Sequence, residues 1–427
     1  MQKPITAVIV GAGHRAMLYA TYAAQHPEKL RIAGVADPNP ARRADAQKLY
    51  GFADEYCFES AAQLAEHEKL ADAVINGTMD AQHVATSIPL LERGYHLLLE
   101  KPFALNEPEM LRLLQVARQT KRTVLICHVL RYAPFYTEIR RRILAGAIGD
   151  IINLQATEHV SYHHLAVSYI RGKWAREDEC GATMLLAKCC HDMDLLIWLK
   201  ANPPKRFASF GGIFQFVPGR RPKNAADRCL CCPAESDCLY SARKHYLDHP
   251  GRWAFYVWDG LEKDASPAQR EQSLATSPYG RCVWACNQTA VDHQSVLIEF
   301  EDGATATLNM IGGAAKPERN LHIVGTRGEI KGVFDDSRFA VRTIDTKAET
   351  GYREEEIDLS IGGDKSGAFG GHGGGDLLLV EDFVALLQGN TPSISCTAIT
   401  DSVYGHMAVF KAEESRLNAT ITEMPPL

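Results

Sequence analysis

The sequence has no long hydrophobic run and no excess of positive charge. No uninterrupted apolar stretch approaches the roughly 18 residues that a membrane-spanning helix needs, so we expect no membrane partner. Against 46 Lys and Arg stand 52 Asp and Glu, a formal charge of −6 at pH 7, without a long basic run. This balance argues against nucleic acid as the main partner. Apolar residues make up 46% of the 427 residues, which is typical of a globular protein with a large core.

An export signal is also missing from the first residues. Residues 1–10 carry one Lys and a short apolar run, Ile5–Val10, which ends at Gly11. A secretory signal has a longer apolar segment followed by a small-residue cleavage site. We therefore expect a cytoplasmic protein whose sequence begins with a strand. In the cytoplasm the twelve cysteines indicate free thiols or a metal site rather than disulfides.

The first 130 residues alternate between short apolar runs and helix-like stretches. Strands that alternate with helices form βαβ units and a parallel sheet, and near-continuous apolar strands fit burial on both faces of that sheet. We therefore predict an α/β fold with an N-terminal doubly wound parallel sheet, a Rossmann domain, over residues 1–130. The expected strands cover residues 5–10, 32–36, 73–75, 96–99 and 123–127, with helices at 15–24, 41–50, 82–92 and 107–119.

From Asp150 the pattern changes to successive short strands separated by turn residues, and Asp302-Gly303 is the clearest hairpin signal. We predict an α+β domain over residues 131–427 with a large, mostly antiparallel sheet. A Cys-rich insertion of little periodicity interrupts it at about 217–290. The glycine-rich stretch 366–375 is expected to be a mobile or tightly turning loop. The expected strands cover residues 151–160, 206–216, 294–300, 304–311, 321–324, 329–333, 339–344 and 354–359, with helices at 184–200, 377–387 and 397–417.

A glycine motif of the form G-x-G-x-x-A lies where the first strand passes into the first helix. Gly11 permits the tight turn, Gly13 lets the backbone approach a pyrophosphate, and Ala16 keeps the helix close to the sheet. The helix N-terminus, at His14 and Arg15, then faces the phosphates with its free N–H groups and the positive end of its dipole. The motif therefore predicts a dinucleotide site.

Asp37 supports the same site because it ends the second apolar strand, where an acidic side chain can hold both ribose hydroxyls. A carboxylate repels a 2′-phosphate, so Asp37 favours NAD over NADP. Arg42 and Arg43 follow closely and can moderate that preference, although we favour a solvated helix face for them. The alternative for the whole motif is a turn that binds nothing, which the matching context disfavours.

Glu100-Lys101-Pro102 follows the predicted strand at 96–99. A G-x-G-x-x-A near the N-terminus, a Glu-Lys-Pro after the fifth predicted strand and a later antiparallel domain together resemble the Gfo/Idh/MocA oxidoreductases, which include glucose–fructose oxidoreductase and inositol dehydrogenase. The resemblance covers nearly the whole chain. It implies that Glu100 and Lys101 lie at the cofactor, that the Pro102 peptide bond is cis, and that Lys101 is a catalytic residue beside the nicotinamide.

The second motif of that family is an Asp followed, four residues later, by a His on a helix of the sheet domain. Here His191 matches, but Ala187 occupies the position of the Asp and Lys188 follows it. The resemblance makes His191 the best catalytic candidate for proton transfer, and Lys188 a candidate for the polar role of the missing Asp. On a helix Lys188, His191 and Asp194 follow one another at intervals of three residues and share a face. The alternative is a His without chemistry that its helix neighbours satisfy.

Two further segments are predicted to bind substrate. One follows the last strand of the nucleotide domain, at the carboxyl edge where α/β sheets bind ligands. The other is a loop after the first strand of the second domain, where polar and aromatic residues mix; this suits a sugar, whose hydroxyls need hydrogen bonds and whose C–H faces stack on rings. A subunit contact or an ordinary surface loop explains that stretch equally well. The predicted substrate residues are His128, Arg131, Tyr132, Tyr162, His164, Arg171 and Asp194.

The insertion is dense in cysteine. Thiolates at C-x2-C spacing can surround one tetrahedral ion, and zinc would supply folding energy to a segment with a small core. We predict a structural zinc site, in which Cys231 or Cys286 can substitute for one ligand. Free buried thiols and an iron–sulfur cluster are the alternatives, and a catalytic zinc is disfavoured because four thiolates leave no open position. The expected ligands, supported by the resemblance, are Cys229, Cys232, Cys238 and Cys282.

These features predict an NAD-dependent oxidoreductase that transfers hydride between a secondary hydroxyl of a sugar, glycoside or cyclitol and the nicotinamide. His191 would take the hydroxyl proton, and Lys101 would relay a proton or stabilise the alkoxide. The first alternative, implied by relatives resembling the family, is an NAD-dependent glycosidase that oxidises a ring hydroxyl transiently and returns the hydride. The second is a nucleotide-bound sensor without chemistry. An exposed sheet face in the second domain would have to be covered, and the resemblance implies that subunits pair there, as a homodimer or homotetramer.

Overall fold

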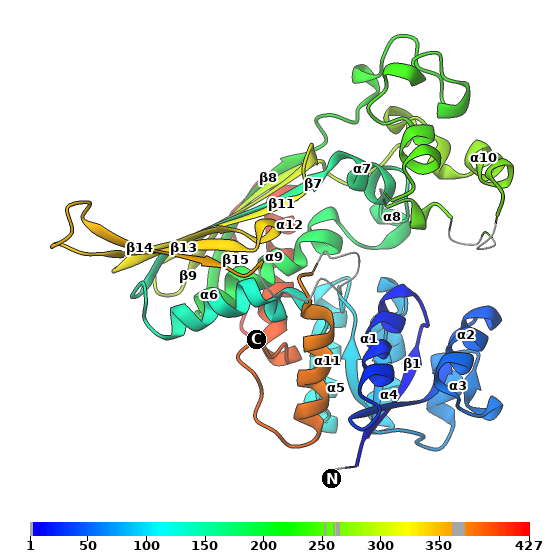
Figure 1. Cartoon of the computed structure of the whole chain (residues 1–427), viewed down its shortest axis with the longest axis horizontal. Coiled ribbons are helices and arrows are strands. Elements are labelled where there is room, and N and C mark those ends of the chain that lie inside the picture. Colours follow the sequence, from blue (N-terminus) through cyan, green and yellow to red (C-terminus); the bar gives the residue numbers. More distant parts are fainter. Residues whose placement is uncertain (1–2, 252, 259–260, 262–264, 361–371) are drawn as a thin grey trace.

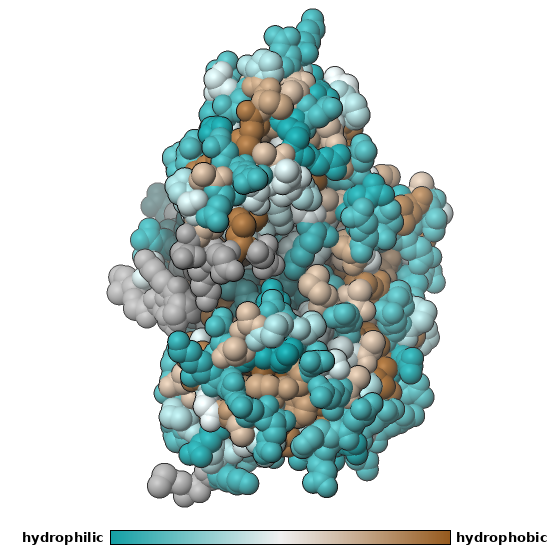
Figure 2. All heavy atoms as spheres, turned by 90° about the vertical axis from the view of Figure 1, so that its right-hand side faces the viewer, coloured by the Kyte–Doolittle hydropathy of each residue, from teal (hydrophilic) through white to brown (hydrophobic). Residues whose placement is uncertain are grey.

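The computed structural model describes residues 3–251, 253–258, 261, 265–360 and 372–427 (Figure 1). Two sheets dominate these residues, and helices pack around both. None of the helices in the described ranges combines the length and hydrophobicity that a membrane crossing requires. The face shown in Figure 2 is mostly hydrophilic, with apolar side chains scattered among polar ones.

The first sheet has six parallel strands in the order β3-β2-β1-β4-β5-β6. The strand order reverses direction between β1 and β4, which is the switch point at which such sheets bind ligands. The predicted Rossmann sheet is therefore confirmed. Its strands are β1 (Ile5–Val10), β2 (Leu30–Ala36), β3 (Cys57–Phe58), β4 (Ala73–Asn76), β5 (His96–Leu99) and β6 (Val124–Ile126), and its helices are α1 (His14–Gln25), α2 (Pro40–Tyr50), α3 (Ala61–Glu66), α4 (His83–Glu92) and α5 (Glu107–Thr120).

Local sequence signals explain where these helices begin. Asn39 caps α2 by accepting a backbone N–H of the first turn, and Pro40 occupies the first helical position. Asn106 caps α5 in the same way. Such side chains satisfy helix N–H groups that have no partner within the helix. The start of α1 differs, because Gly13 precedes it and no side chain caps its first N–H groups.

The second sheet has nine strands in the order β14-β13-β12-β11-β7-β10-β9-β8-β15. Its described pairs are antiparallel except β7 with β10, so the predicted, mostly antiparallel sheet is confirmed. One face packs against α9 (Met184–Lys200) and α12 (Ile399–Asn418). The strands are β7 (Ile151–Ser161), β8 (Pro204–Gly212), β9 (His293–Phe300), β10 (Thr305–Ala314), β11 (Glu318–Gly325), β12 (Gly328–Val333), β13 (Arg338–Ile344), β14 (Tyr352–Asp358) and β15 (Thr422–Glu423).

Helix α9 is buried along almost its whole length. Thr183 caps it by accepting the Leu186 N–H, and β7, β10 and α12 pack around it. A helix that is apolar on all sides is typical of such a central position. The polar residues that α9 does carry, among them Lys188 and His191, are therefore inside the protein and must find partners there.

Some elements differ from the predictions. The sequence patterns miss α3 and α6 (Pro134–Leu144). The stretch after β7, expected as a loop, is helical: α7 (Tyr162–Leu165) continues into a π-helical turn at Ala166–Ile170. Within the insertion the described residues form short helical turns and, after Ser266, the regular helix α10 (Pro267–Thr276). The elements that the sequence patterns did not predict are therefore short helical segments.

The C-terminal part of the chain returns to the first sheet. Helix α11 (Gly375–Leu387) packs against α1 and against the turn at Val129–Tyr132. Of the glycine-rich stretch expected to form a turning loop, residues 366–371 lie outside the described residues. Gly373 and Gly374 have φ angles of +57° and +84° and lead directly into α11. Residues near 372–376 are thereby placed beside the nucleotide sheet.

Candidate active site

The glycine turn after β1 is shaped to receive a nucleotide. Gly11 has a φ angle of +76°, and its N–H donates to the Ala36 carbonyl at 2.8 Å. A Cβ atom there would lie 2.7–2.8 Å from backbone atoms of Gly77 and Thr78, so only glycine fits. At Gly13, by contrast, a Cβ atom would meet nothing within 4 Å. This open space at the uncapped start of α1 fits the pyrophosphate of NAD.

Asp37 lies beside the turn, buried just after the end of β2. One carboxylate oxygen accepts the Ala12 N–H at 2.8 Å, and the other accepts the Asn39 N–H at 2.8 Å. Each oxygen retains a second lone pair, so the carboxylate can still accept ribose hydroxyls. Arg43 donates to the Asp37 carbonyl at 2.6 Å, and Arg42 lies 4.0 Å from the carboxylate. These arginines therefore contact Asp37 and do not form a purely solvated helix face.

Glu100 connects the glycine turn to the next residue of the site. Its carboxylate accepts from Arg15 Nε at 2.8 Å, from the Tyr19 hydroxyl at 2.6 Å and from the backbone N–H of Lys101 at 2.8 Å. Burial by itself would raise the pKa of Glu100, but the charges of Arg15 and Lys101 lower it below its ordinary value. Glu100 is therefore an ionised carboxylate that holds Arg15 and the backbone of Lys101 in place, and its expected contact with the cofactor stays a prediction.

Lys101 connects the nucleotide sheet to α9 of the second domain. It follows β5, and its peptide bond to Pro102 is cis, as the resemblance implies. Its ammonium group donates to the backbone carbonyl of Ala187 at 3.0 Å. Ala187 lies in α9 one turn before His191. Lys101 thus contacts the backbone of the residue that stands in place of the expected Asp.

His191 is buried close to Lys101. Burial is the main cause that lowers the pKa of its imidazole well below the ordinary value, and the charge of Lys101 acts in the same direction. The ring is therefore neutral at pH 7, and its Nδ1 atom has no hydrogen-bond partner among the described residues. His128 and His372 flank it, with ring centroids at 5.7 and 5.9 Å. A neutral imidazole with an unpartnered nitrogen can accept a proton.

His372 is a candidate that the sequence patterns missed. Its Nδ1 atom lies 3.1 and 3.2 Å from the two carboxylate oxygens of Asp376, and Arg15 donates to the same carboxylate at 2.6 Å. Burial by itself would raise the pKa of Asp376, but His372 and Arg15 lower it below its ordinary value. The ionised carboxylate fixes the orientation of the imidazole, while burial lowers the pKa of His372 below its ordinary value against the effect of Asp376. The sequence feature that could have indicated His372 is the presence of a histidine within the glycine-rich stretch.

Lys188 is held in a buried cluster of charges. Its ammonium group pairs with Glu158 of β7 at 2.7 Å. Arg319 of β11 pairs with Glu158 at 2.7 Å and with Asp192 at 2.8 Å. The positive charges of Arg319 and Lys188 lower the pKa of Glu158 against the effect of burial. The cluster fastens α9 to the second sheet, and no sequence motif marked Glu158 or Arg319.

Three of the predicted substrate residues are engaged with other side chains. Arg131 forms a bidentate pair with Asp194, at 2.7 and 2.5 Å, and both are buried. Tyr132 donates to Asp382 of α11 at 2.8 Å. The structure therefore places these residues where they hold α9 and α11 in position. His128 differs, because neither of its ring nitrogens has a described hydrogen-bond partner.

Two of the predicted substrate residues, Tyr162 and His164, follow β7 and contact different neighbours. His164 stacks on Trp253 of the insertion, with ring centroids 3.9 Å apart and planes at 4°. Burial lowers the pKa of His164 well below its ordinary value, and the charges of Lys188 and Lys101 add to the effect, so His164 lies near the other candidates. Tyr162 packs instead beside other aromatic rings, including Tyr240 at 6.0 Å.

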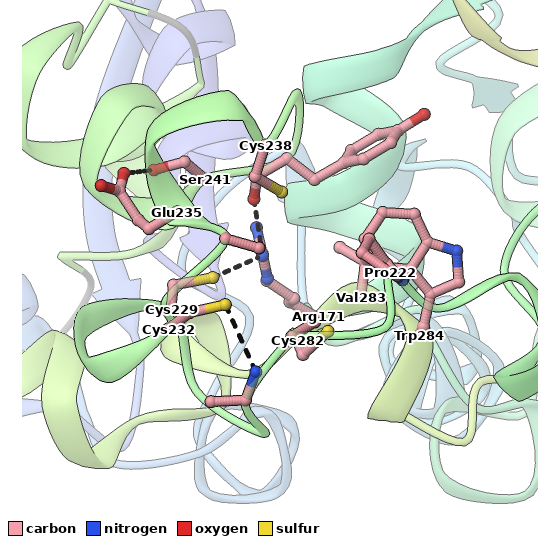
Figure 3. A pocket seen from close by; sticks show the side chains of 14 residues that line it. Arg171, Pro222, Cys229, Cys232, Glu235, Cys238, Ser241, Cys282, Val283 and Trp284 are labelled. Atoms are coloured by element: carbon pink, nitrogen blue, oxygen red, sulfur yellow. Dashed lines mark hydrogen bonds between the residues drawn. The ribbon is translucent and has the colours of Figure 1, made fainter.

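Arg171 lies inside the insertion, in a small pocket that the cysteines surround (Figure 3). It donates to Cys229 Sγ at 3.3 Å and to the Tyr246 hydroxyl at 3.1 Å. Across the described part of the chain, no three His, Cys, Asp or Glu side chains are grouped closely enough to hold a metal ion. Zinc therefore has no direct support. The pocket nevertheless brings together the four predicted ligands, Cys229, Cys232, Cys238 and Cys282.

Comparisons with known proteins identify relatives of both parts of the chain. Residues 5–128 match a family profile described as "Oxidoreductase family, NAD-binding Rossmann fold", and residues 140–398 match "Oxidoreductase family, C-terminal alpha/beta domain". YteT of Bacillus subtilis, which is named only provisionally as an oxidoreductase, is 25% identical over 82% of this chain and 81% of its own length. Inositol 2-dehydrogenase of Corynebacterium glutamicum is 22% identical over 47% of this chain and only 56% of its own length.

Solved structures share the fold along the whole chain. Levoglucosan dehydrogenase in complex with NADH is 15% identical, with a TM-score of 0.71 and full coverage of both chains. The WlbA dehydrogenase of Bordetella pertussis, in complex with NADH and UDP-GlcNAcA, is 16% identical, with a TM-score of 0.68 over 100% of this chain and 99% of its own. At such identities the likeness establishes the fold, not the substrate.

The buried histidines predict a loss of stability in acid. Burial lowers the pKa of His128 to about 4 and that of His406 to about 3, from an ordinary value of 6.5. Below pH 6.5 the unfolded chain binds protons that the folded chain does not, so the free energy of unfolding falls as the pH is lowered from 6.5 toward 4. Each such histidine contributes at most about 1.4 kcal/mol per pH unit.

Urea unfolding at pH 7, 6 and 5 measures this dependence. We expect His406→Gln to show a shallower pH dependence than the parent, and His249→Gln, which alters an exposed histidine, to match the parent. An identical slope in the parent and in His406→Gln would contradict the account.

Proposed function

The chain belongs to the Gfo/Idh/MocA family of oxidoreductases, and from this premise we propose that it transfers hydride between NAD and a secondary hydroxyl of a sugar, glycoside or cyclitol. The observation that carries the proposal is the contact between Lys101 and α9, where the ammonium group meets the Ala187 carbonyl one turn before His191. An amine and an imidazole from distant parts of the chain thus lie close together. Glu100 links Lys101 to Arg15 in the first turn of α1.

The substrate class is supported by relatives and by the side chains around Lys101. The names of the relatives include an inositol 2-dehydrogenase and a levoglucosan dehydrogenase, which act on cyclic polyhydroxy compounds. In this chain three imidazoles, His128, His191 and His372, lie close together, and His164 lies near Lys101 and Lys188. Neutral imidazoles can each donate or accept a hydrogen bond, which suits a ligand rich in hydroxyl groups.

The proposed proton transfer uses His191, Lys101 and His372. NAD, when bound, supplies the hydride acceptor. His191 is neutral because it is buried beside a cation, so it can take the hydroxyl proton as the C–H bond breaks. The ammonium group of Lys101 stabilises negative charge that develops on the same oxygen. Asp376 orients His372, and the centroids of the His372 and His191 rings are 5.9 Å apart. His372 can therefore receive that proton in turn.

The cofactor preference follows from Asp37. Its carboxylate lies beside the glycine turn and retains lone pairs for two ribose hydroxyls. A 2′-phosphate at the same place would meet this negative charge, so NAD is favoured over NADP. Arg42 and Arg43 reduce the preference without reversing it, because both contact Asp37 itself.

Replacement of Lys101 tests the assignment. Lys101→Met removes the charge and the hydrogen bond to Ala187 but leaves the glycine turn intact, so we expect turnover to fall by at least about a hundredfold while NAD affinity changes little. Lys48→Met, which alters an exposed lysine of α2, is the control and should keep full activity. The measurements are reduction of NAD with inositol, levoglucosan and a panel of glycosides, and NAD binding by calorimetry.

The same assay separates the dehydrogenase from the glycosidase alternative. Accumulation of reduced nicotinamide with a polyol supports net oxidation. Release of the aglycone from a glycoside without net absorbance change would instead favour hydrolysis through transient oxidation. Full activity of Lys101→Met in either reaction would refute the role of Lys101.

We also infer an oligomer from the open face of the second sheet. Apolar side chains on that face are between 42 and 75% exposed, and strand alternation puts them opposite the face that α9 and α12 cover. A second copy that covers this face would explain them, which supports a homodimer or homotetramer. The residues are Phe210, Leu297 and Ile311.

We further propose that the thiols of the insertion take up a structural zinc ion. Four cysteines line one pocket, and the described hydrogen-bond partners of the buried Arg171 include no carboxylate. A buried guanidinium without a carboxylate is costly unless another anion balances it, and thiolates, including Cys229 at 3.3 Å, would do so. The proposal requires the four sulfur atoms to draw closer together than they are in this structure.

Metal analysis of protein purified without chelator tests this site. We expect about one zinc per chain, and its loss in Cys232→Ser or Cys238→Ser together with a lower unfolding temperature. Cys57→Ser, in the nucleotide domain, is the control that should keep the metal. Zinc-free parent protein with twelve titratable thiols would show that these cysteines are free.

A further inference from the structure

The insertion reaches the candidate active site through a short aromatic segment. Phe255 and Tyr256 have ring centroids 4.2 Å apart, and Trp253 stacks on His164 at 3.9 Å. The Phe255 ring also lies 6.1 Å from the ring of His14, the first residue of α1. One segment of the insertion therefore lies against both the start of α1 and the helical segment after β7.

Trp174 extends this aromatic surface. Its ring meets Tyr256 edge-on at 5.9 Å, and its indole N–H donates to Asp80 at 2.9 Å. Asp80 lies in a short turn that follows β4 in the nucleotide sheet. The rings are half-buried, so part of each is accessible. We call the four residues Trp174, Trp253, Phe255 and Tyr256 the aromatic wall.

None of the four side chains of the aromatic wall is itself charged, and the ammonium group of Lys173 lies over the Trp174 ring, 4.1 Å from its centroid. Burial raises the pKa of Tyr256 to about 12, and Arg15 and Glu100 are close enough to affect it. His164, on which Trp253 stacks, is near Lys101 and is neutral as well. An aromatic surface binds apolar ring faces, such as the C–H face of a sugar or an aryl group.

The extent of the aromatic wall exceeds what one substrate ring needs. Neighbouring ring centroids of the wall are 4.2–6.2 Å apart, and Phe255 in turn lies 6.1 Å from the ring of His14 at the start of α1, so the series of rings is longer than one sugar ring. Resting on the function proposed above, we propose that the aromatic wall is a subsite for the second ring of a glycoside, a neutral sugar or aryl group linked to the sugar that is oxidised. The insertion thereby selects glycosides over free sugars and cyclitols.

Paired ligands test the subsite without requiring turnover. p-Nitrophenyl glycosides and methyl glycosides of the same sugars share the first ring and differ in the second. We expect p-nitrophenyl glycosides to quench tryptophan fluorescence of the NAD-bound protein at concentrations about tenfold lower than those at which the methyl glycosides compete. Trp253→Ala should remove that difference and leave NAD affinity unchanged, and Tyr256→Ala should reduce it.

Matched variants separate binding from folding. Trp253→Phe keeps a ring and should retain most of the preference, and Leu239→Ala, which alters a residue of the insertion that is 72% exposed, should equal the parent. Equal affinities for the two ligand classes in the parent, or an unchanged preference in both alanine variants, would overturn the subsite. If hydride transfer is absent but the aryl preference is present and lost in Trp253→Ala, the proposed function fails and the subsite stands.

Discussion

The hydrogen bond from Lys101 to the carbonyl of Ala187 is the contact on which the rest of the site depends. It joins the end of β5, in the nucleotide sheet, to α9, which the second sheet buries. An ammonium group must have a partner in a buried place, and at this position the chain offers a backbone carbonyl where the family has an Asp. Among the described residues, the hydrogen bond that holds the Lys101 ammonium group goes to this backbone carbonyl and not to a carboxylate. His191, one turn further along α9, is held beside the same cation.

Burial divides the polar residues of the centre into two groups. Residues with strong partners form the scaffold: Lys188 with Glu158, and Arg131 with Asp194, tie α9 to its surroundings through pairs that are expensive to break. The imidazoles of His128 and His191 instead retain nitrogens without a hydrogen-bond partner in the described part of the chain, although His128 Nε2 lies 3.9 Å from Asp194. Groups that remain unpartnered in a buried site are the ones available to a ligand. The paired residues hold α9 in place, so the two imidazoles can keep nitrogens that are available to a ligand.

Local patterns in the sequence were sufficient for much of the fold and part of the site. The glycine turn, Asp37 and α9 each depend on residues close in sequence, so their type and spacing predict them. Partnerships across strands could not be predicted in this way. Lys188 meets Glu158 and Arg319 because β7 and β11 are neighbours in the sheet, and no spacing in the sequence encodes that register. For the same reason Arg171, expected at the substrate, proved to lie among the cysteines. His372 was overlooked because glycine-rich neighbours suggested only a loop.

A crystal structure of the protein with NAD and a polyol that it oxidises tests the central claim most directly. The account predicts that one hydroxyl oxygen of the polyol lies within hydrogen-bonding distance of both the Lys101 ammonium group and the His191 imidazole. A polyol bound elsewhere, or in contact with only one of these two side chains, would contradict it.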